Sequence, residues 1–218
     1  MKTLPSRLLV ITDRHQARHP LEDIAEAVAQ AGGRWLLFRD KDLETAARRA
    51  LAGRLAALAH RHGMHLSVSR DVGVAAEHGA SVHLPSQHLE PGRMKAAAVA
   101  RLALAPGALV GVSAHAPGDI ARAAAMGADY VTLSPVFATA SKPGYGPALG
   151  LPALEQAARA GTAAGVAVLA LGGVTAANAR TCLDAGAAGV AVMGEIMRAE
   201  DPGGSAAGLL AALASRPA

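Results

Sequence analysis

The sequence predicts a (β/α)8 barrel that takes in the whole chain, residues 1–218, as one domain. Eight short apolar runs rich in Val, Ile and Leu alternate with alanine-rich segments of helical composition. A glycine stands just before seven of these runs, where it can adopt the left-handed conformation that ends a helix. These glycines are Gly33, Gly63, Gly79, Gly107, Gly127, Gly165 and Gly186. An open doubly wound sheet is the alternative, because it uses the same alternation.

The strands are expected at the apolar runs, which are short and follow a glycine or precede a polar turn. In chain order they are residues 8–11, 35–38, 65–68, 82–84, 109–112, 130–133, 167–170 and 190–192. The helices are expected between them, because alanine favours the helix. In chain order they are residues 21–31, 43–62, 71–78, 92–103, 117–126, 151–164, 175–185 and 204–214. The Asp-Pro-Gly-Gly stretch at 201–204 is expected to be a turn into the last helix.

Composition limits the core and the partners. Apolar residues make up 51% of the chain and aromatic residues 2%, so the core must come from Ala, Val, Leu and Ile. The net charge of +4 comes from dispersed arginines, which disfavours nucleic acid and suits a small anionic substrate. Cys182 is the single cysteine and is expected to be a small core or surface residue. No run is long enough for a signal peptide or a membrane span, so we expect a cytoplasmic protein without a membrane partner.

Three strand ends in the last third of the chain indicate what it binds. Residues 131–146, 169–174 and 189–196 each begin as an apolar strand and break into Gly, Ser, Thr or Lys. Ligands of parallel α/β proteins bind at the carboxyl ends of the strands. Two successive glycine turns, Gly172-Gly173 and Met193-Gly194, can bind phosphate through backbone N–H groups. We expect a small phosphorylated ligand, and two tight turns without a ligand are the alternative.

Two cations follow the second strand. Arg39 and Lys41 alternate with Leu37, so the three side chains share one face. If that face is the barrel interior, both cations reach the mouth, where they suit phosphate or pyrophosphate. A solvated charged loop is the alternative.

The loop after the sixth strand is long for a compact fold. It carries Thr139, Ser141 and Lys142 beside glycines, a combination that could surround a ligand and close over it. An ordinary polar surface loop is the alternative.

The fifth strand ends with a candidate acid–base residue. Ser113 and His115 alternate onto one face at the expected mouth, and histidine titrates near neutral pH. A histidine that caps the next helix is the alternative. His83 and His88, on either side of a proline-containing turn, are weaker candidates, and no His, Asp and Glu residues have a metal-ligand spacing.

These motifs, in this order, resemble the thiamine phosphate synthase/TenI family. The resemblance runs nearly from end to end and rests on residues 11–14, 39–41, 82–85, 111–115, 127–131, 135–142, 171–174 and 189–192. It implies a (β/α)8 barrel that handles thiazole phosphate. Thiamine phosphate synthase joins hydroxymethylpyrimidine pyrophosphate to thiazole phosphate with the help of magnesium. The TenI-like thiazole tautomerase aromatises a thiazole phosphate carboxylate by a proton shift.

The resemblance also assigns roles to individual residues. Arg39 and Lys41 match the pyrophosphate-binding cations of the synthase, and further ligand-binding positions match Ser113, Thr139, Ser141, Lys142, Gly173, Met193 and Gly194. Leu37 stands where the synthase has Gln, and Ser69 and His88 stand where it has acidic magnesium ligands. Pro85 and Ser86 are similar to TenI-like sequences, and His115 matches the TenI acid–base histidine.

The lead expectation is therefore a TenI-like tautomerase of thiamine biosynthesis that needs no metal or other cofactor. The first alternative is a thiamine phosphate synthase with a relocated Mg²⁺ site, since hard cations require oxygen ligands such as carboxylates. The second is a non-catalytic regulatory protein that binds thiazole phosphate. A homodimer is a further expectation from the resemblance.

Overall fold

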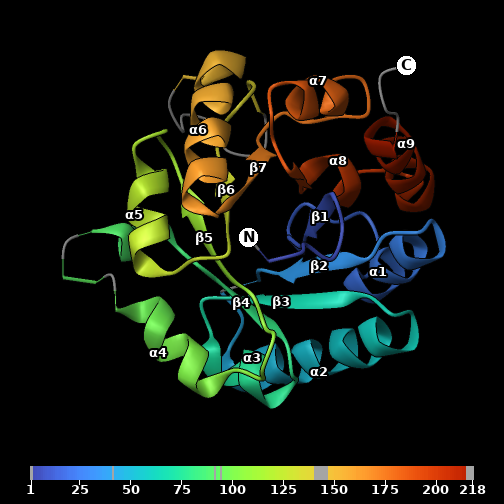
Figure 1. The fold of residues 1–218 in the computed structure, drawn as a ribbon. Coiled ribbons are helices and arrows are strands. Elements are labelled where there is room, and N and C mark those ends of the chain that lie inside the picture. Colours follow the sequence, from blue (N-terminus) through green and yellow to red (C-terminus); the bar gives the residue numbers. More distant parts are fainter. Residues whose placement is uncertain (1, 41, 91, 94, 140–146, 215–218) are drawn as a thin grey trace.

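Eight parallel strands close into a barrel in the order of the chain (Figure 1), which confirms the predicted (β/α)8 fold. The computed structural model describes residues 2–40, 42–90, 92–93, 95–139 and 147–214. The strands are β1 Leu8–Ile11, β2 Trp35–Phe38, β3 His65–Ser69, β4 Ser81–Leu84, β5 Val110–Ala114, β6 Tyr130–Leu133, β7 Ala167–Leu171 and β8 Gly189–Val192. Pairing of β1 with both β2 and β8 closes the cylinder.

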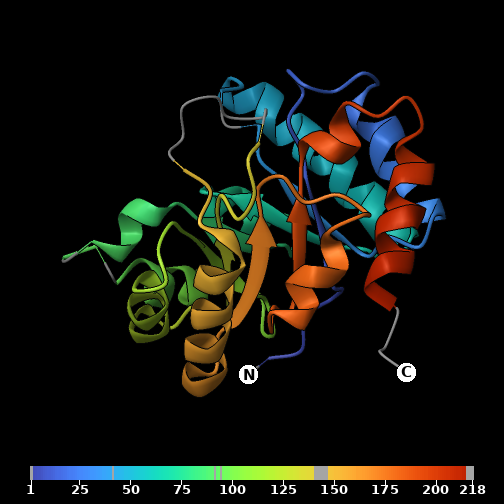
Figure 2. The same ribbon diagram turned by 90° about the horizontal axis from the view of Figure 1, so that it is seen from above.

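The helices surround the barrel, as Figures 1 and 2 show. They are α1 Leu21–Gln30, α2 Thr45–Arg61, α3 Val72–Glu77, α4 Ala96–Ala103, α5 Asp119–Met126, α6 Gly150–Ala164, α7 Ala179–Asp184, α8 Gly194–Met197 and α9 Pro202–Ala214. A 3₁₀ turn, η1, covers Ser86–Leu89. Among the described residues, no helix is long and apolar enough to cross a membrane.

Alternation along each strand divides the core into two layers. On β1, Leu8 and Val10 pack in the large cluster between barrel and helices, whereas Leu9 and Ile11 belong to the cluster inside the barrel. Both faces of the strand are buried, which is why these strands are continuous apolar runs. Leu37 also belongs to the interior cluster. The face that it shares with Arg39 is therefore the barrel interior.

The barrel interior has a polar half. Buried polar side chains come from strands β3, β4 and β6, and they are Ser67, Ser69, Ser81, His83 and Thr132. On β7 and β8 the interior positions carry apolar residues such as Leu169 and Ala191. The mouth of the barrel therefore meets a polar wall on one side and an apolar wall on the other.

Several helices begin at other residues than predicted; α4, for example, begins at Ala96 rather than at residue 92. The last helix begins at Pro202 because the Asp201 side chain accepts a hydrogen bond from Gly204 N at 2.8 Å, so the expected turn is its first turn. α7 begins only at Ala179, after a turn in which Thr175 N donates to the Asn178 side chain at 2.9 Å. The short helix α8 was not predicted.

One predicted glycine role was wrong. Gly32, not Gly33, has the left-handed backbone, with φ of 95°. Gly33 instead lies against α1, where a Cβ atom would meet Val28 Cγ1 at 2.4 Å. The other six glycines do have positive φ. Cys182 is fully buried, which settles it as a core residue, and burial raises the pKa of its thiol to about 11.

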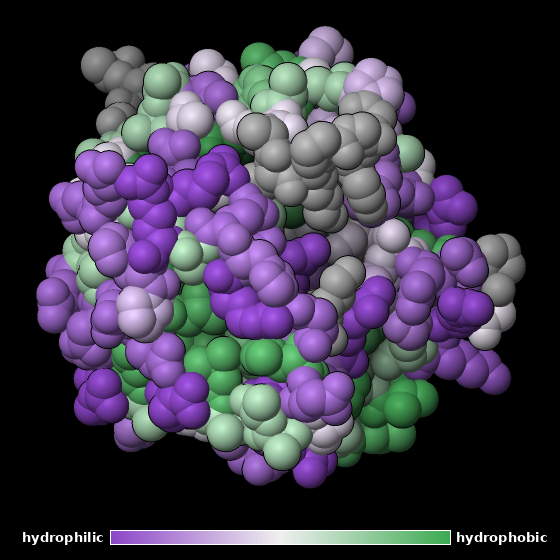
Figure 3. Space-filling view, turned by 180° about the vertical axis from the view of Figure 1, so that it is seen from behind, coloured by the Kyte–Doolittle hydropathy of each residue, from purple (hydrophilic) through white to green (hydrophobic). Residues whose placement is uncertain are grey.

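The outer surface is mostly polar. Figure 3, seen from the side opposite to Figure 1, shows a largely hydrophilic face with hydrophobic residues gathered in its lower part. Among the described large hydrophobic residues, Val99 and Leu102 on α4 are exposed. In Figure 2 the labelled chain ends lie low in the view, while the orange strand arrows point upward, toward the carboxyl ends of the strands.

Candidate functional site

Two adjoining cavities open at the carboxyl ends of the strands. The first, of about 280 Å³, is called the glycine cavity, and its walls are residues 171–175 and 191–195 with Ile11, Arg39, Ser134, Pro135, Ala138, Thr139 and Arg198. The second, of about 200 Å³, is called the polar cavity, and its walls include Ser69, Arg70, His83, Ser86, Gln87, Ser113, His115 and Thr132. Ile11, Arg39, Ser134 and Leu171 line both, so the two cavities form one cleft.

The turn after β7 is held by the segment after β6. Val136 N donates to Leu171 O at 2.9 Å, and Phe137 N donates to Gly172 O at 3.0 Å. Gly172 and Gly173 have φ of 96° and 64°, a conformation that favours glycine. A Cβ atom on Gly173 would also meet Ala138 O at 2.3 Å. Both glycines are therefore required by the backbone that forms this wall.

The second wall of the glycine cavity begins at Met193. α8 starts at Gly194, and a Cβ atom there would meet the Arg198 guanidinium within 2.6 Å. Arg198, which donates to the Gln16 side chain, therefore brings a cation over the helix start. Backbone N–H groups at a helix start beside an arginine suit an anion.

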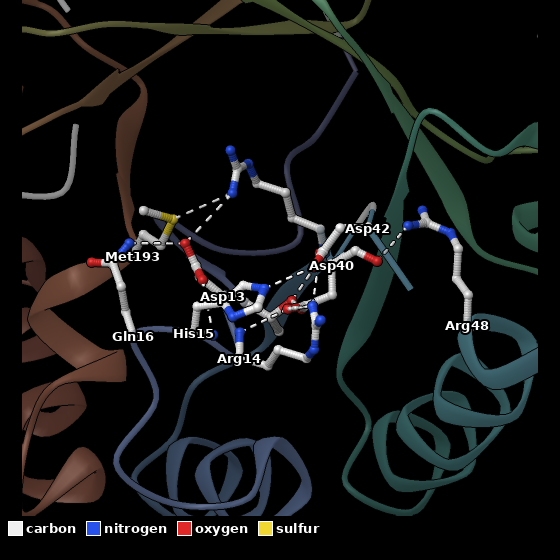
Figure 4. A network of polar contacts seen from close by, with 10 residues as sticks. Asp13, Arg14, His15, Gln16, Asp40, Asp42, Arg48 and Met193 are labelled. Carbon is white, nitrogen blue, oxygen red and sulfur yellow. Dashed lines mark hydrogen bonds and ion pairs between the residues drawn. The ribbon is translucent and has the colours of Figure 1, made fainter. Parts of the chain in front are cut away.

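Arg39 stands between the two cavities. Its Nη1 lies 3.7 Å from Asp13 Oδ2 and 3.9 Å from Met193 Sδ, so contacts from β1 and β8 hold the guanidinium. Gln16 Nε2 donates to the same Asp13 carboxylate at 2.8 Å. Figure 4 shows Asp13, Gln16 and Met193 grouped on one side of this network.

Buried contacts beneath Arg39 fix the ends of β1 and β2. Asp40 is 4% exposed, and its carboxylate accepts from Thr12 Oγ1 at 2.6 Å and from Arg14 N at 2.7 Å. Arg48, from α2, donates to Asp40 O at 2.7 Å and to Ser69 O at 2.6 Å. Figure 4 shows Arg48 reaching Asp40 from the helix side. These contacts support the cleft from behind and do not line it.

His115 is oriented by the backbone on both sides. Its Nδ1 lies 2.9 Å from Ser134 O, and because a carbonyl only accepts, Nδ1 must carry a proton. In the neutral ring, Nε2 is then the nitrogen that can accept a proton. The backbone N–H groups of His115 and Ala116 both donate to Asp119 Oδ2, at 2.8 and 3.0 Å, so Asp119 holds the turn. α5 begins after Gly118 without a side-chain cap, and the His115 ring contacts Ser134 O instead, so the alternative role of His115 as the cap of this helix is wrong.

The positions that would hold magnesium in a synthase do not fit that ion. Ser69 lines the polar cavity with a neutral hydroxyl, and its carbonyl is bonded to Arg48. His88 lies on η1, and its Nδ1 is buried without a hydrogen-bond partner among the described residues. Within the described part of the chain, no three His, Cys, Asp or Glu side chains are placed to hold a metal ion. The nearby carboxylates of Asp13 and Asp40 are paired with arginines.

Most of the predicted site residues surround this cleft. Arg39, Ser113 and His115 line the polar cavity, and Arg39, Thr139, Gly172, Gly173, Met193 and Gly194 line the glycine cavity. Their roles in binding and catalysis remain predictions. Lys41, Ser141 and Lys142 lie outside the described residues.

Sequence reasoning missed Arg70 and Arg198 and gave His83 only as a weaker candidate. Arg70 has a positive φ of 68° and lines the polar cavity, but its place in a plain Ser-Arg-Asp run gives no signal. His83 was set aside because it precedes a proline turn. Its alternation with the strand residues Ser81 and Val82 could have placed it inside the barrel.

Comparison with known proteins assigns the chain to one family, on which the family model and the relatives agree. The family model described as thiamine monophosphate synthase matches residues 8–196. A putative thiamine-phosphate synthase of Geobacter sulfurreducens is 39% identical over 211 residues, which are 96% of this chain and 95% of the relative. A thiamine-phosphate synthase of Thiobacillus denitrificans is 36% identical and covers 100% of this chain and 99% of the relative.

A solved structure agrees with these relatives. The thiamine phosphate pyrophosphorylase from Pyrococcus furiosus superposes with a TM-score of 0.79 at 26% identity, and the match covers 94% of each chain. The similarity therefore extends over nearly the whole chain.

Proposed function

Because the chain belongs to the thiamine monophosphate synthase family, we propose that it is a thiamine-biosynthesis enzyme that isomerises a thiazole phosphate carboxylate. The phosphate binds in the glycine cavity, at the backbone N–H groups of the turn after β7 and the start of α8. Arg39 and Arg198 supply positive charge on either side of it. A small dianion suits this combination of backbone donors and guanidinium groups.

The observation that carries the proposal is the position of His115. It lines the polar cavity, which opens into the glycine cavity, so a ligand held by its phosphate can present its ring to the imidazole. With Nδ1–H bonded to Ser134 O, the Nε2 atom takes a proton from a ring carbon and returns it elsewhere on the same molecule. No atoms are gained or lost, and the reaction is an isomerisation.

This proton transfer needs no divalent ion. That agrees with Ser69 and His88, neither of which supplies a carboxylate to hold one. The charge that develops on the substrate during proton transfer lies beside Arg39 and Arg70, which line the polar cavity. No step requires a carboxylate at Ser69 or His88.

The test is turnover of the carboxylated thiazole phosphate by the purified enzyme, followed by the ultraviolet change that aromatisation causes. Isomerisation that persists in EDTA is the expected result. Binding of the ligand without isomerisation would contradict the proposal and leave the non-catalytic binder.

Thiamine phosphate synthase is the second candidate. It is favoured by the names of the relatives and by Arg39, which stands where that reaction needs a cation for pyrophosphate. It predicts magnesium-dependent release of pyrophosphate when both synthase substrates are present.

A further inference from the structure

The loop between β1 and α1 joins two arginines that line the glycine cavity. Gln16 Oε1 accepts a hydrogen bond from Arg198 Nη1, and Gln16 Nε2 donates to Asp13 Oδ2 at 2.8 Å. The same Asp13 oxygen lies 3.7 Å from Arg39 Nη1. These four residues are called the arginine bridge, and Figure 4 shows the part of it where Gln16 meets Asp13.

The chemistry of the two ends requires an amide between them. A guanidinium only donates hydrogen bonds and a carboxylate only accepts them, so the link must accept on one side and donate on the other. The Gln16 side chain does both, with its oxygen toward Arg198 and its nitrogen toward Asp13. A glutamate at this position would place two carboxylates together, and a lysine would place an ammonium beside the Arg198 guanidinium.

The backbone of the loop holds Gln16 and Asp13 in place. Asp13 Oδ1 accepts from His15 N at 3.1 Å, and Gln16 N donates to Asp13 O at 3.1 Å. Arg18 N donates to Met197 O at 2.9 Å, which ties the loop to α8. The side chains that join the two arginines therefore project from an anchored turn.

The arginine bridge leaves Arg39 with donors to offer. Arg39 and Arg198 belong to the wall of the glycine cavity, whereas Gln16 and Asp13 are not among its described wall residues. The contacts of the Arg39 guanidinium with Asp13 and with Met193 Sδ both involve Nη1. Within the described part of the chain, hydrogen bonds engage neither its Nε nor its Nη2, so these groups can donate to a ligand.

Restraint of these arginines bears directly on affinity. Ordering an arginine side chain costs conformational entropy, which a ligand must offset when it binds. Arg198 is exposed and Arg39 has 26% of its side chain exposed, so burial alone fixes neither of them. A phosphate that meets two arginines already held by the bridge loses less affinity to this ordering than one that meets two free side chains.

We propose that Gln16 is a positioning residue, which restrains Arg198 directly and Arg39 through Asp13 and thereby raises the affinity of the glycine cavity for the phosphate of the substrate. This inference rests on the proposed function for the identity of the phosphorylated ligand. The contacts of the bridge themselves do not depend on it.

The first test is NMR of the arginine Nε–H groups in the protein without ligand. Gln16→Met keeps the length of the side chain and removes both of its hydrogen bonds, so the Nε–H signals of Arg39 and Arg198 should both shift. Arg18→Met is the control, because Arg18 lies in the same loop and pairs with Glu200 at 2.7 Å, outside the bridge. It should leave both signals as in the wild type. Unchanged Arg39 and Arg198 signals in Gln16→Met would overturn the proposal.

The second test is calorimetric titration of the same variants with thiazole phosphate. Gln16→Met should raise the dissociation constant about fivefold, which is the effect of having to order arginine side chains on binding. Arg18→Met should leave it unchanged, and equal weakening in the two variants would show that the loop as a whole, not the bridge, is responsible. Absence of binding by the wild-type protein would count against the proposed function, whereas the NMR test uses no ligand and decides the inference by itself.

A double-mutant cycle with Arg198→Met shows whether Gln16 acts through this arginine. The double variant should bind thiazole phosphate more tightly than the product of the two single losses predicts, because Gln16 then has no Arg198 to restrain. Losses that simply multiply would contradict the proposal. In turnover, Gln16→Met should raise KM and leave kcat nearly unchanged, since His115 lies in the polar cavity. A fall in kcat with an unchanged KM would also contradict it.

Discussion

One carbonyl determines which nitrogen of the neutral His115 ring carries the proton. Ser134 O can only accept, so its 2.9 Å contact places the proton of the neutral ring on Nδ1. Ser134 comes directly after β6, and it lines both cavities. The residue that orients the imidazole is therefore part of the wall of both cavities.

Replacing His115 with Asn should abolish the isomerisation while sparing ligand binding. General acid–base groups contribute about 10²–10⁴-fold to rate, so kcat should fall by at least about a hundredfold. The dissociation constant for thiazole phosphate should change little, because the phosphate is held in the glycine cavity. Steady-state kinetics and calorimetric titration measure the two effects. Full turnover by His115→Asn would remove the assigned role.

His83 predicts how stability depends on pH. The pKa of its ring falls from 6.5 to about 3 because of burial, so the fold favours the neutral form. The stability that the fold gains from holding His83 neutral is fully present above pH 6.5 and is lost as the pH falls toward 3. The free energy of unfolding should decrease through this window by up to about 1.4 kcal/mol per pH unit. Denaturant titrations across this range give the slope.

In His83→Gln the free energy of unfolding should change less steeply with pH between 6.5 and 3, even if the variant is less stable at neutral pH. His60→Gln is the control, because His60 is exposed on α2 and its replacement leaves the interior unchanged. The prediction fails if His83→Gln and the wild-type protein lose stability with the same slope.

At the scale of elements, the turn after β7 depends on the segment after β6. A Cβ atom at 173 would lie 2.3 Å from Ala138 O and 2.7 Å from Phe137 Cβ, at a φ of 64°. Gly173→Ala should therefore displace the turn and weaken thiazole phosphate binding at least about tenfold. This is the effect of losing one to two backbone hydrogen bonds to the ligand. Calorimetric titration measures the change.

Gly165→Ala is the matched control for backbone strain. Gly165 ends α6 with a φ of 74°, and a Cβ atom there would meet nothing within 4 Å. It should cost about 1 kcal/mol of stability and leave the binding constant unchanged. Equal loss of affinity in both variants would mean that the glycine cavity is not where the phosphate binds.

Arg48 joins the carboxyl ends of β2 and β3. It is 7% exposed, and its guanidinium donates to Asp40 O and Ser69 O and lies 5.2 Å from the centre of the Phe38 ring. Arg48→Met should lower the free energy of unfolding by about 3 kcal/mol, because it leaves these carbonyls without their donor. Chemical denaturation measures the loss.

Arg49→Met is the comparison for this change. Arg49 pairs with Glu77 at 3.7 Å on an exposed surface and should contribute no more than about 0.5 kcal/mol. Similar losses of unfolding free energy in Arg48→Met and Arg49→Met would show that the link between β2 and β3 adds little to stability.

At the scale of the whole molecule, the barrel was predictable because its strands are buried on both faces. Continuous apolar runs such as Leu8–Ile11 and Trp35–Phe38 are typical of parallel strands buried on both faces, and their bounds agree with the structure. The ends of helices were less predictable, since Asp201 and Asn178 act through side-chain contacts that depend on tertiary position. α8 is only one turn long, too short for a periodic pattern.

The mouth of the barrel was predictable wherever strand alternation fixes a side chain. Arg39 follows Leu37 onto the interior face, and His115 follows Ser113. Residues that reach the cleft from elsewhere gave no such signal. Arg198 does so from beyond α8.

The cleft as a whole combines a glycine-rich half, where we propose that the phosphate binds, with a polar half that has arginines and two histidines, while Ser69 and His88 stand where a synthase would need carboxylates. The measurement that tests this most directly follows thiamine phosphate formation from thiazole phosphate and hydroxymethylpyrimidine pyrophosphate across a magnesium titration. We expect no product at any magnesium concentration, while the same preparation isomerises the carboxylated thiazole phosphate. Magnesium-dependent formation of thiamine phosphate would contradict this and establish a synthase whose metal is held elsewhere.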